Sequence, residues 1–167
     1  MIYSWTFKTS LGKFRLKAMP KGLYSLEGPG RRETRPCPSK GKPPRRIQTL
    51  LKEAASKISS YLSGRKVDLG RLRVDWTAYG GFEKKVLQEL RKVPCGKTES
   101  YQSLARRAGN PKAARAVGQI LHRNRLPFVL PCHRIIPKGG GLGGFSKGVG
   151  WKRRLLKLEE SLVDKIA

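Results

Sequence analysis

The chain has 167 residues, 38% of them hydrophobic, which is enough for one domain or two small ones and argues against a disordered chain. It carries 37 lysines and arginines against 11 acidic residues, a net charge of +26. The part before Thr77 has 18 basic and 5 acidic residues and the rest has 19 and 6, so each part carries +13. A charge spread this evenly favours a polyanion such as nucleic acid as the partner, although a generally basic or ribosome-associated protein has a similar composition.

The sequence has no apolar run near the roughly 20 residues that cross a bilayer, and no signal peptide at its start. We therefore expect a cytoplasmic protein with reduced thiols. Cys37, Cys95 and Cys132 are far apart and form no Cys-x-x-Cys pair, and neither His122 nor His133 shares a helix face with them. We expect no metal site.

The first part of the chain predicts a small α/β domain. Residues 1 to 28 alternate apolar and polar side chains between short turns, which predicts an antiparallel meander. Residues 28 to 46, rich in Gly, Pro, Lys and Arg, predict a loop. An amphipathic helix is predicted from Ile47 to Gly64, followed by a last strand or an extended connector over 67 to 76. We place the domain at 1–77, find no catalytic constellation in it, and take 78–167 as a second domain.

The second domain is predicted to be mainly helical. A first helix begins at Phe82 and stops before Pro94. Ser100 is expected to cap a second helix that runs through Ala108, with Gly109 in a left-handed conformation.

A third helix is expected to have Asn110 as its cap and Pro111 as its first residue, and to run through Leu121. Together the second and third helices predict a helix-turn-helix, with an ordinary helical hairpin as the alternative. The segment 112–118 exposes little bulk beyond Arg115, and a helix that reads base edges needs more hydrogen-bonding side chains than this. The pattern therefore favours docking that is independent of sequence.

The stretch Leu130-Pro131-Cys132-His133-Arg134 places a thiol beside an imidazole, ahead of the glycine-rich run 139–144. This pair suggests a buried nucleophile facing a pocket, and a structural core cysteine is the alternative. The stretch closely resembles the active-site segment of the O6-alkylguanine-DNA alkyltransferases, whose signature is Pro-Cys-His-Arg between a short apolar run and a glycine-rich loop. The further matches at the family's spacings are Asn124, Pro127, Gly143, Ser146 and Glu159. The resemblance reaches back to about Phe82 and so covers roughly the second half of the chain.

The resemblance implies DNA repair by direct reversal. An alkyl group moves irreversibly from O6 of guanine, and also from O4 of thymine, to Cys132, after the damaged nucleotide has been rotated out of the duplex. Because a thioether has no easy hydrolytic exit, each molecule reacts once. The implied fold is a ribonuclease H-like α/β domain followed by a winged-helix-like domain. The implied partner is double-stranded DNA, bound in the minor groove with little sequence specificity by a monomer that needs no cofactor.

The resemblance also implies roles for individual residues. Cys132 is the nucleophile, His133 its base acting through a water, and Glu159, with Glu160 as the alternative, orients His133. Tyr101 gives a proton to the departing guanine, and Asn124 ties the third helix to the active-site segment. The implied DNA-binding residues are Arg115, which is inserted into the duplex, and Tyr101, Lys112, Ala113, Ala114, Gly118 and Arg134. The expected pocket residues are Leu121, Ile135, Leu142, Gly143, Phe145 and Ser146.

Other interpretations remain open from the residues alone. Arg115 also fits a solvated side chain or a simple phosphate contact, and Glu159 fits a solvent-facing carboxylate. Phe145 stands where several relatives have a tyrosine, so a hydrogen bond from that position is not implied here. The alternative functions are a non-catalytic adaptor that binds alkylated lesions and a cysteine hydrolase. The adaptor would lack the reactive cysteine, and the hydrolase would turn over and would not need a basic helix-turn-helix.

Overall fold

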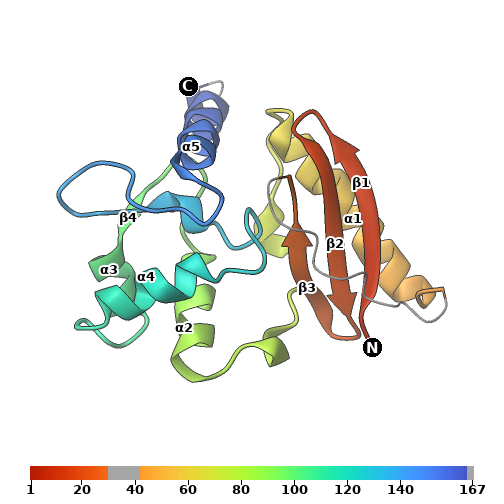
Figure 1. The fold of residues 1–167 in the computed structure, drawn as a ribbon, viewed down its shortest axis with the longest axis horizontal. Coiled ribbons are helices and arrows are strands. Elements are labelled where there is room, and N and C mark those ends of the chain that lie inside the picture. The colour runs from red at the N-terminus through yellow and green to blue at the C-terminus, as the bar shows by residue number, and fades with distance from the viewer. Residues whose placement is uncertain (30–41, 165–167) are drawn as a thin grey trace. The chain divides into compact units, whose positions relative to one another are not determined.

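The computed structural model describes residues 1–29 and 42–164, and the chain divides into two compact units, Met1–Ala78 and Tyr79–Ala167 (Figure 1). Most of the loop predicted over 28 to 46, and Cys37 with it, lies outside the described residues. Within the described residues, no helix is long and apolar enough to span a bilayer.

Unit 1 is a three-stranded antiparallel meander covered by one helix, as predicted. The strands β1 (Tyr3–Thr9), β2 (Gly12–Met19) and β3 (Gly22–Glu27) pair in sequence order, and α1 (Arg45–Leu62) contacts all three. Alternation on β2 buries Phe14, Leu16 and Ala18, and the helical period on α1 buries its apolar stripe. The hydrophobic core of the unit lies between these two surfaces.

The connector that follows α1 is extended and contains two single 3-10 turns, Leu69–Arg71 and Trp76–Ala78. Between them, Val74 forms one isolated parallel bridge with Leu23 of β3. The sequence left open a strand or a connector, and the structure has the connector.

Unit 2 is mainly helical. It contains α2 (Gly81–Leu90), α3 (Tyr101–Arg107), α4 (Ala114–His122) and α5 (Val149–Asp164). Two short parallel strands, β4 (Glu99–Ser100) and β5 (Ile135–Ile136), join the start of α3 to the segment after Cys132. The helices α2, α3 and α4 pack on one another, and α3 and α4 are the two helices of the predicted helix-turn-helix or helical hairpin. Ser100 caps α3 as predicted, because its hydroxyl accepts a hydrogen bond from Ser103 N at 3.1 Å, and Gly109 has a φ of 89°.

The predicted start of the third helix is wrong. Asn110 does not cap α4, which begins at Ala114, with Ala113 as its flanking residue and no side-chain cap. Instead, Ala113 N donates to Asn110 O at 3.1 Å and closes a turn over Pro111. A proline suits the second position of a turn as well as the first position of a helix, and the sequence could not separate the two.

Candidate active site

Cys132 begins a single 3-10 turn, Cys132–Arg134, and its side chain is almost fully buried at 4% exposure. The buried amide of Asn124 donates from Nδ2 to Cys132 Sγ at 3.1 Å and to Leu130 O at 2.8 Å. The Oδ1 atom of Asn124 accepts from Leu126 N at 3.0 Å. One side chain at the end of α4 therefore fixes both the loop before the cysteine and the position of the sulfur.

The carboxylate of Glu159, on α5, is fully buried and receives hydrogen bonds from several sides. His133 Nε2 lies 2.8 Å from Glu159 Oε1, Arg134 contacts both carboxylate oxygens at 2.8 to 3.2 Å, and Gly96 N donates to Oε2 at 3.1 Å. Burial by itself would raise the pKa of Glu159, but the hydrogen bonds from His133 and Arg134 outweigh it and hold the pKa far below its usual value. The buried carboxylate is therefore ionised and holds His133 in one orientation. Glu160, the alternative from the sequence, is exposed.

The resting thiol and imidazole are both neutral. Burial raises the pKa of Cys132, and the hydrogen bond from Asn124 offsets only part of that rise. Burial lowers the pKa of His133, and the hydrogen bond with Glu159 opposes this shift without reversing it. A neutral imidazole can accept a proton, whereas a protonated thiol must lose one before it becomes a strong nucleophile.

Lys152 is a buried cation near the thiol that the sequence analysis missed. It has no exposed surface, and its Nζ donates to Ile135 O at 2.5 Å and lies 6.0 Å from the centroid of the Tyr101 ring. Burial lowers the pKa of Lys152, and burial together with the nearby Cys132 raises the pKa of Tyr101. The signal was present in the sequence, because Lys152 shares one helix face of α5 with Leu155 and Glu159.

A cavity of about 350 Å³ opens onto Cys132. Its lining residues are Tyr101, Gly118, Gln119, Leu121, His122, Cys132, Gly144, Phe145 and Ser146. The polar groups of α4 that line it, Gln119 and His122, had no role in the sequence analysis. On α4, His122 lies three residues after Gln119 and four after Gly118, so these residues share one face of the helix. That spacing could have revealed them from the sequence.

Three of the expected pocket residues, Leu121, Phe145 and Ser146, line the cavity, and the other three are not among its lining residues. Ile135 is fully buried in β5. Leu142 and Gly143 are only half-buried, and a Cβ at Gly143, whose φ is 66°, would meet Pro137 at 3.0 Å. The sequence predicted that the glycine-rich segment approaches the cavity, but not which of its residues lie at the surface of the cavity.

Arg134 does not have the free guanidinium that a DNA contact needs. Besides its contacts with Glu159, its Nη1 donates to Val93 O at 2.6 Å, and its side chain is only 12% exposed. The DNA contact of Arg134 stays a prediction that these interactions do not favour, because the guanidinium already compensates the buried carboxylate inside unit 2.

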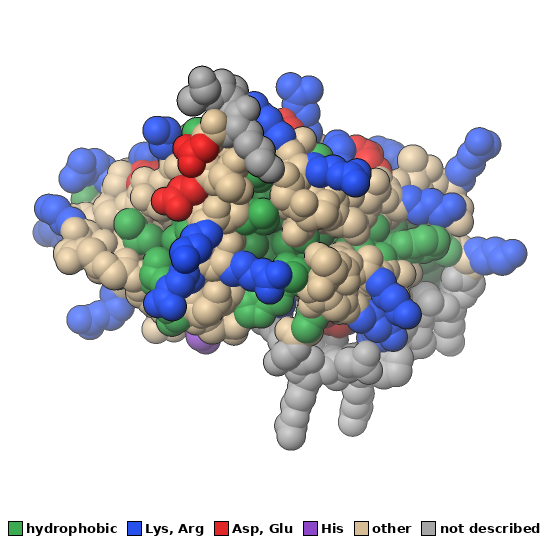
Figure 2. All heavy atoms as spheres, turned by 90° about the horizontal axis from the view of Figure 1, so that it is seen from above, with side chains coloured by type: hydrophobic (Ala, Val, Ile, Leu, Met, Phe, Trp, Pro, Cys, Tyr) green, Lys and Arg blue, Asp and Glu red, His purple; other side chains and the backbone are tan. Residues whose placement is uncertain are grey.

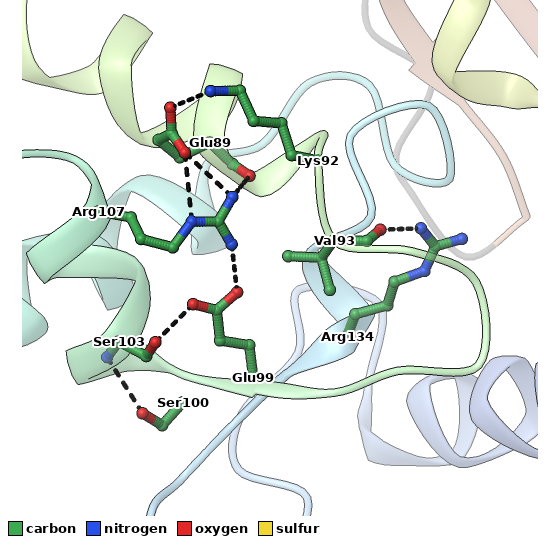
Figure 3. A network of polar contacts seen from close by, with 8 residues as sticks. All are labelled: Glu89, Lys92, Val93, Glu99, Ser100, Ser103, Arg107 and Arg134. Atoms are coloured by element: carbon green, nitrogen blue, oxygen red, sulfur yellow. Dashed lines mark hydrogen bonds and ion pairs between the residues drawn. The ribbon is translucent and has the colours of Figure 1, made fainter.

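A second arginine holds the start of α3 (Figure 3). Arg107 Nη1 contacts Glu99 Oε2 at 2.6 Å, and its Nη2 donates to Glu89 O at 2.9 Å and to Glu89 Oε2 at 3.0 Å. Ser103 Oγ in turn donates to Glu99 Oε1 at 2.6 Å. This network ties the end of α2 to β4, directly before Tyr101.

Apart from Arg134, the residues expected to contact DNA lie on or directly before the helices α3 and α4. Lys112 and Arg115 are exposed, Ala113 and Ala114 are partly exposed, and Gly118 lines the cavity. A Cβ at Gly118 would lie 3.9 Å from the Tyr101 ring. On the face drawn in Figure 2, lysine and arginine side chains are spread over the surface and acidic ones are few.

Within the residues searched, 1–29 and 42–164, no group of three or more His, Cys, Asp and Glu side chains could hold a metal ion. The polar cluster around Cys132 is instead formed by one thiol, one imidazole, one carboxylate and two cations.

Comparisons with known proteins point to one class, the methylated-DNA–protein-cysteine methyltransferases. A family model described as "6-O-methylguanine DNA methyltransferase, DNA binding domain" matches residues 81–161. The chain is 40% identical over 113 residues to the methylated-DNA–protein-cysteine methyltransferase of Methanosarcina mazei, a match that covers 67% of this chain and 70% of that protein. It is 40% identical over 111 residues to the protein of that name from Salmonella typhimurium, covering 65% and 63%.

Among solved structures, the Mycobacterium tuberculosis OGT in complex with DNA has a TM-score of 0.78 and 29% identity, covering 95% of this chain and 93% of that one. The chain belongs to the O6-methylguanine DNA methyltransferase family.

Proposed function

We propose that the protein repairs DNA by direct reversal, moving an alkyl group from O6 of guanine in duplex DNA to Cys132, once per molecule. The observation that carries the proposal is that Cys132, though 4% exposed, lines a cavity of about 350 Å³ and is followed by an imidazole held by a buried carboxylate. Ligand pockets start at about 300 Å³, so a cavity of this size suits a single everted base. O4 of thymine is the second position from which we expect the alkyl group to be removed.

The thiol reacts after it loses its proton. An ordinary thiol with a pKa of about 8.5 is only a few per cent ionised at neutral pH, and burial raises the pKa of Cys132 further. We assign His133 as the base, acting through a water, and Glu159 as the group that orients it. As the proton leaves, the positive charge of Lys152 stabilises the thiolate.

The transfer forms an S–C bond while the bond between the alkyl carbon and O6 breaks, so guanine leaves with the electron pair. We assign Tyr101 as the donor of the proton that neutralises the departing guanine. Its ring lines the cavity with Cys132, which supports that role. The thiol proton held by His133 then restores the tyrosine, and the net products are a thioether and neutral guanine.

We further propose that α4 docks in the minor groove with little sequence preference and that Arg115 occupies the space left by the everted nucleotide. The exposure of Arg115 and the small side chains of Ala113, Ala114 and Gly118 support this mode. The protein is expected to act as a monomer in the cytoplasm, where a reactive thiol stays reduced.

A non-catalytic lesion-binding adaptor is the second candidate, since the helix-turn-helix and cavity would serve it equally well. The thiol at the cavity favours transfer, because an adaptor has no use for a nucleophile there.

The replacement Cys132→Ser separates the two candidates. With a duplex carrying labelled O6-methylguanine, the wild-type protein should bind and become labelled, and the variant should bind with nearly the same affinity without becoming labelled. Binding without labelling by the wild-type protein would establish an adaptor instead. Loss of binding in the variant would mean that the sulfur serves the structure and not the reaction.

A further inference from the structure

Unit 1 contains a hollow of about 240 Å³ that the proposed reaction does not use. The first turns of α1, the turn between β2 and β3, and the connector around residue 72 contribute its lining residues. Three arginines, Arg46, Arg71 and Arg73, line it together with mainly apolar residues and one acidic residue, Glu53. We call it the arginine hollow.

The elements around the arginine hollow are fixed to one another. Leu23 N donates to Arg73 O at 2.7 Å, and Arg73 Nε donates to Lys21 O at 2.8 Å. A Cβ at Gly22 would lie 2.6 Å from the carbonyl carbon of Val74, so the connector and the β2–β3 turn are in direct backbone contact. The connector that carries Arg71 and Arg73 is therefore held against the β2–β3 turn.

The charge of the arginine hollow is not neutralised from within. Glu53 is paired with Lys57 at 2.7 Å. Arg71 contacts Asp68 at 3.0 Å, but its side chain is 85% exposed, where such a pair is weak. Within residues 1–29 and 42–164, no ion pair or side-chain hydrogen bond engages Arg46.

We propose that the arginine hollow is a second nucleic-acid site, which takes backbone phosphates on unit 1 independently of alkyl transfer. Guanidinium groups bind phosphate oxygens in pairs, and a strand offers phosphates at regular intervals to several arginines at once. Exposed arginines around an open hollow suit such a strand better than a small anion, which requires enclosure. Such a site would also explain why the part of the chain before Thr77 carries a net charge of +13 although it contains no catalytic groups.

The test compares two double variants of the full chain that each remove two charges from unit 1. Arg46→Gln with Arg71→Gln alters the arginine hollow, and Arg73 is kept because it holds the β2–β3 turn. Lys13→Gln with Arg65→Gln removes two exposed cations that do not line the hollow. Affinity for an undamaged 20-base-pair duplex is measured across a range of salt concentrations.

Each phosphate contact contributes about 0.9 to the slope of log affinity against log salt, so the slope of the hollow variant should become shallower by about 1.8. The matched variant should change it by less than half as much. Equal changes in both variants, or no change in the hollow variant, would overturn the proposal.

A second measurement separates a strand from a small anion. Inorganic pyrophosphate, added to the ¹⁵N-labelled protein, should shift the amide signals of Ile47 to Leu50 weakly, and undamaged duplex should shift them at far lower concentration. Shifts with pyrophosphate alone would assign the hollow to small phosphates and contradict a strand site. Transfer from free O6-benzylguanine is scored separately and should be unchanged in the hollow variant. A wild-type protein that transfers nothing would sink the proposed function without altering the salt measurement.

Discussion

The reactivity of Cys132 depends on its pKa, which the nearby charge of Lys152 lowers. The cation opposes the rise that burial causes in the pKa of the thiol, so replacing Lys152 by Met should raise that pKa further. The rate of reaction with free O6-benzylguanine should then shift to higher pH and fall at neutral pH, about tenfold for each unit of pKa. The exposed Lys157→Met on the same helix is the control. Identical pH profiles for wild type and Lys152→Met would remove the lysine from the mechanism.

Glu159 links the site to acid stability. Its pKa is lower in the folded protein than the usual value of about 4.3, so the folded state gains stability above that pH and loses it progressively as pH falls below it. Glu159→Gln removes the carboxylate that pairs with the mostly buried Arg134. It should lower the free energy of unfolding by about 3 kcal/mol at pH 7.

Urea unfolding at pH 7 and at a series of pH values from about 4.3 down to about 2 measures both effects. The exposed Glu160→Gln should change the free energy of unfolding by no more than about 0.5 kcal/mol. If Glu159→Gln were as mild as Glu160→Gln, the buried carboxylate would not be holding His133 and Arg134.

At the scale of elements, the segment between α4 and Cys132 depends on one amide. Asn124→Ala removes its three hydrogen bonds and leaves buried backbone groups without them, which should cost about 2 kcal/mol in urea unfolding. Asn110 lies outside the site and does not cap α4, so it serves as the control. Asn110→Ala should lower the free energy of unfolding by only about a few tenths of a kcal/mol. A large loss of stability in Asn110→Ala would instead show that Asn110 caps α4, contrary to the structure.

The helix α4 is expected to act on duplex DNA and not on a free base. Arg115→Ala should therefore slow repair of a duplex lesion by about tenfold or more, since filling the gap offsets a few kcal/mol of unstacking, and should leave reaction with free O6-benzylguanine unchanged. Lys112→Ala, an exposed cation just before the helix, should weaken binding mainly through salt-dependent phosphate contact. Equal losses on duplex and free base in Arg115→Ala would rule out an inserted arginine.

Element types were predictable wherever one local signal decided them. The alternation of apolar and polar residues predicted the meander of unit 1, and Ser100 as a helix cap predicted the start of α3. The start of α4 was not predictable, because Asn110-Pro111 is equally compatible with a helix cap and with the turn that forms.

At the scale of the whole molecule, the sequence predicted the thiol, imidazole and carboxylate that come together, and missed the partners that tertiary packing supplies. The pairing of Arg134 with Glu159 and the burial of Lys152 depend on how α5 packs beside the Cys132 turn. These contacts join residues 25 and 17 positions apart in the sequence. The family resemblance implied a DNA contact for Arg134, and a sequence does not show which arginine must compensate a buried carboxylate.

The proposed repair reaction requires that one buried sulfur, that of Cys132, accepts one alkyl group. Intact-mass and peptide analysis after incubation with excess duplex carrying O6-methylguanine tests it most directly. We expect a single added methyl on the peptide that contains Cys132, with the yield of repaired guanine levelling off at one per protein molecule. Repaired guanine that keeps accumulating beyond the number of protein molecules, or a methyl found at Cys95 instead, would contradict it.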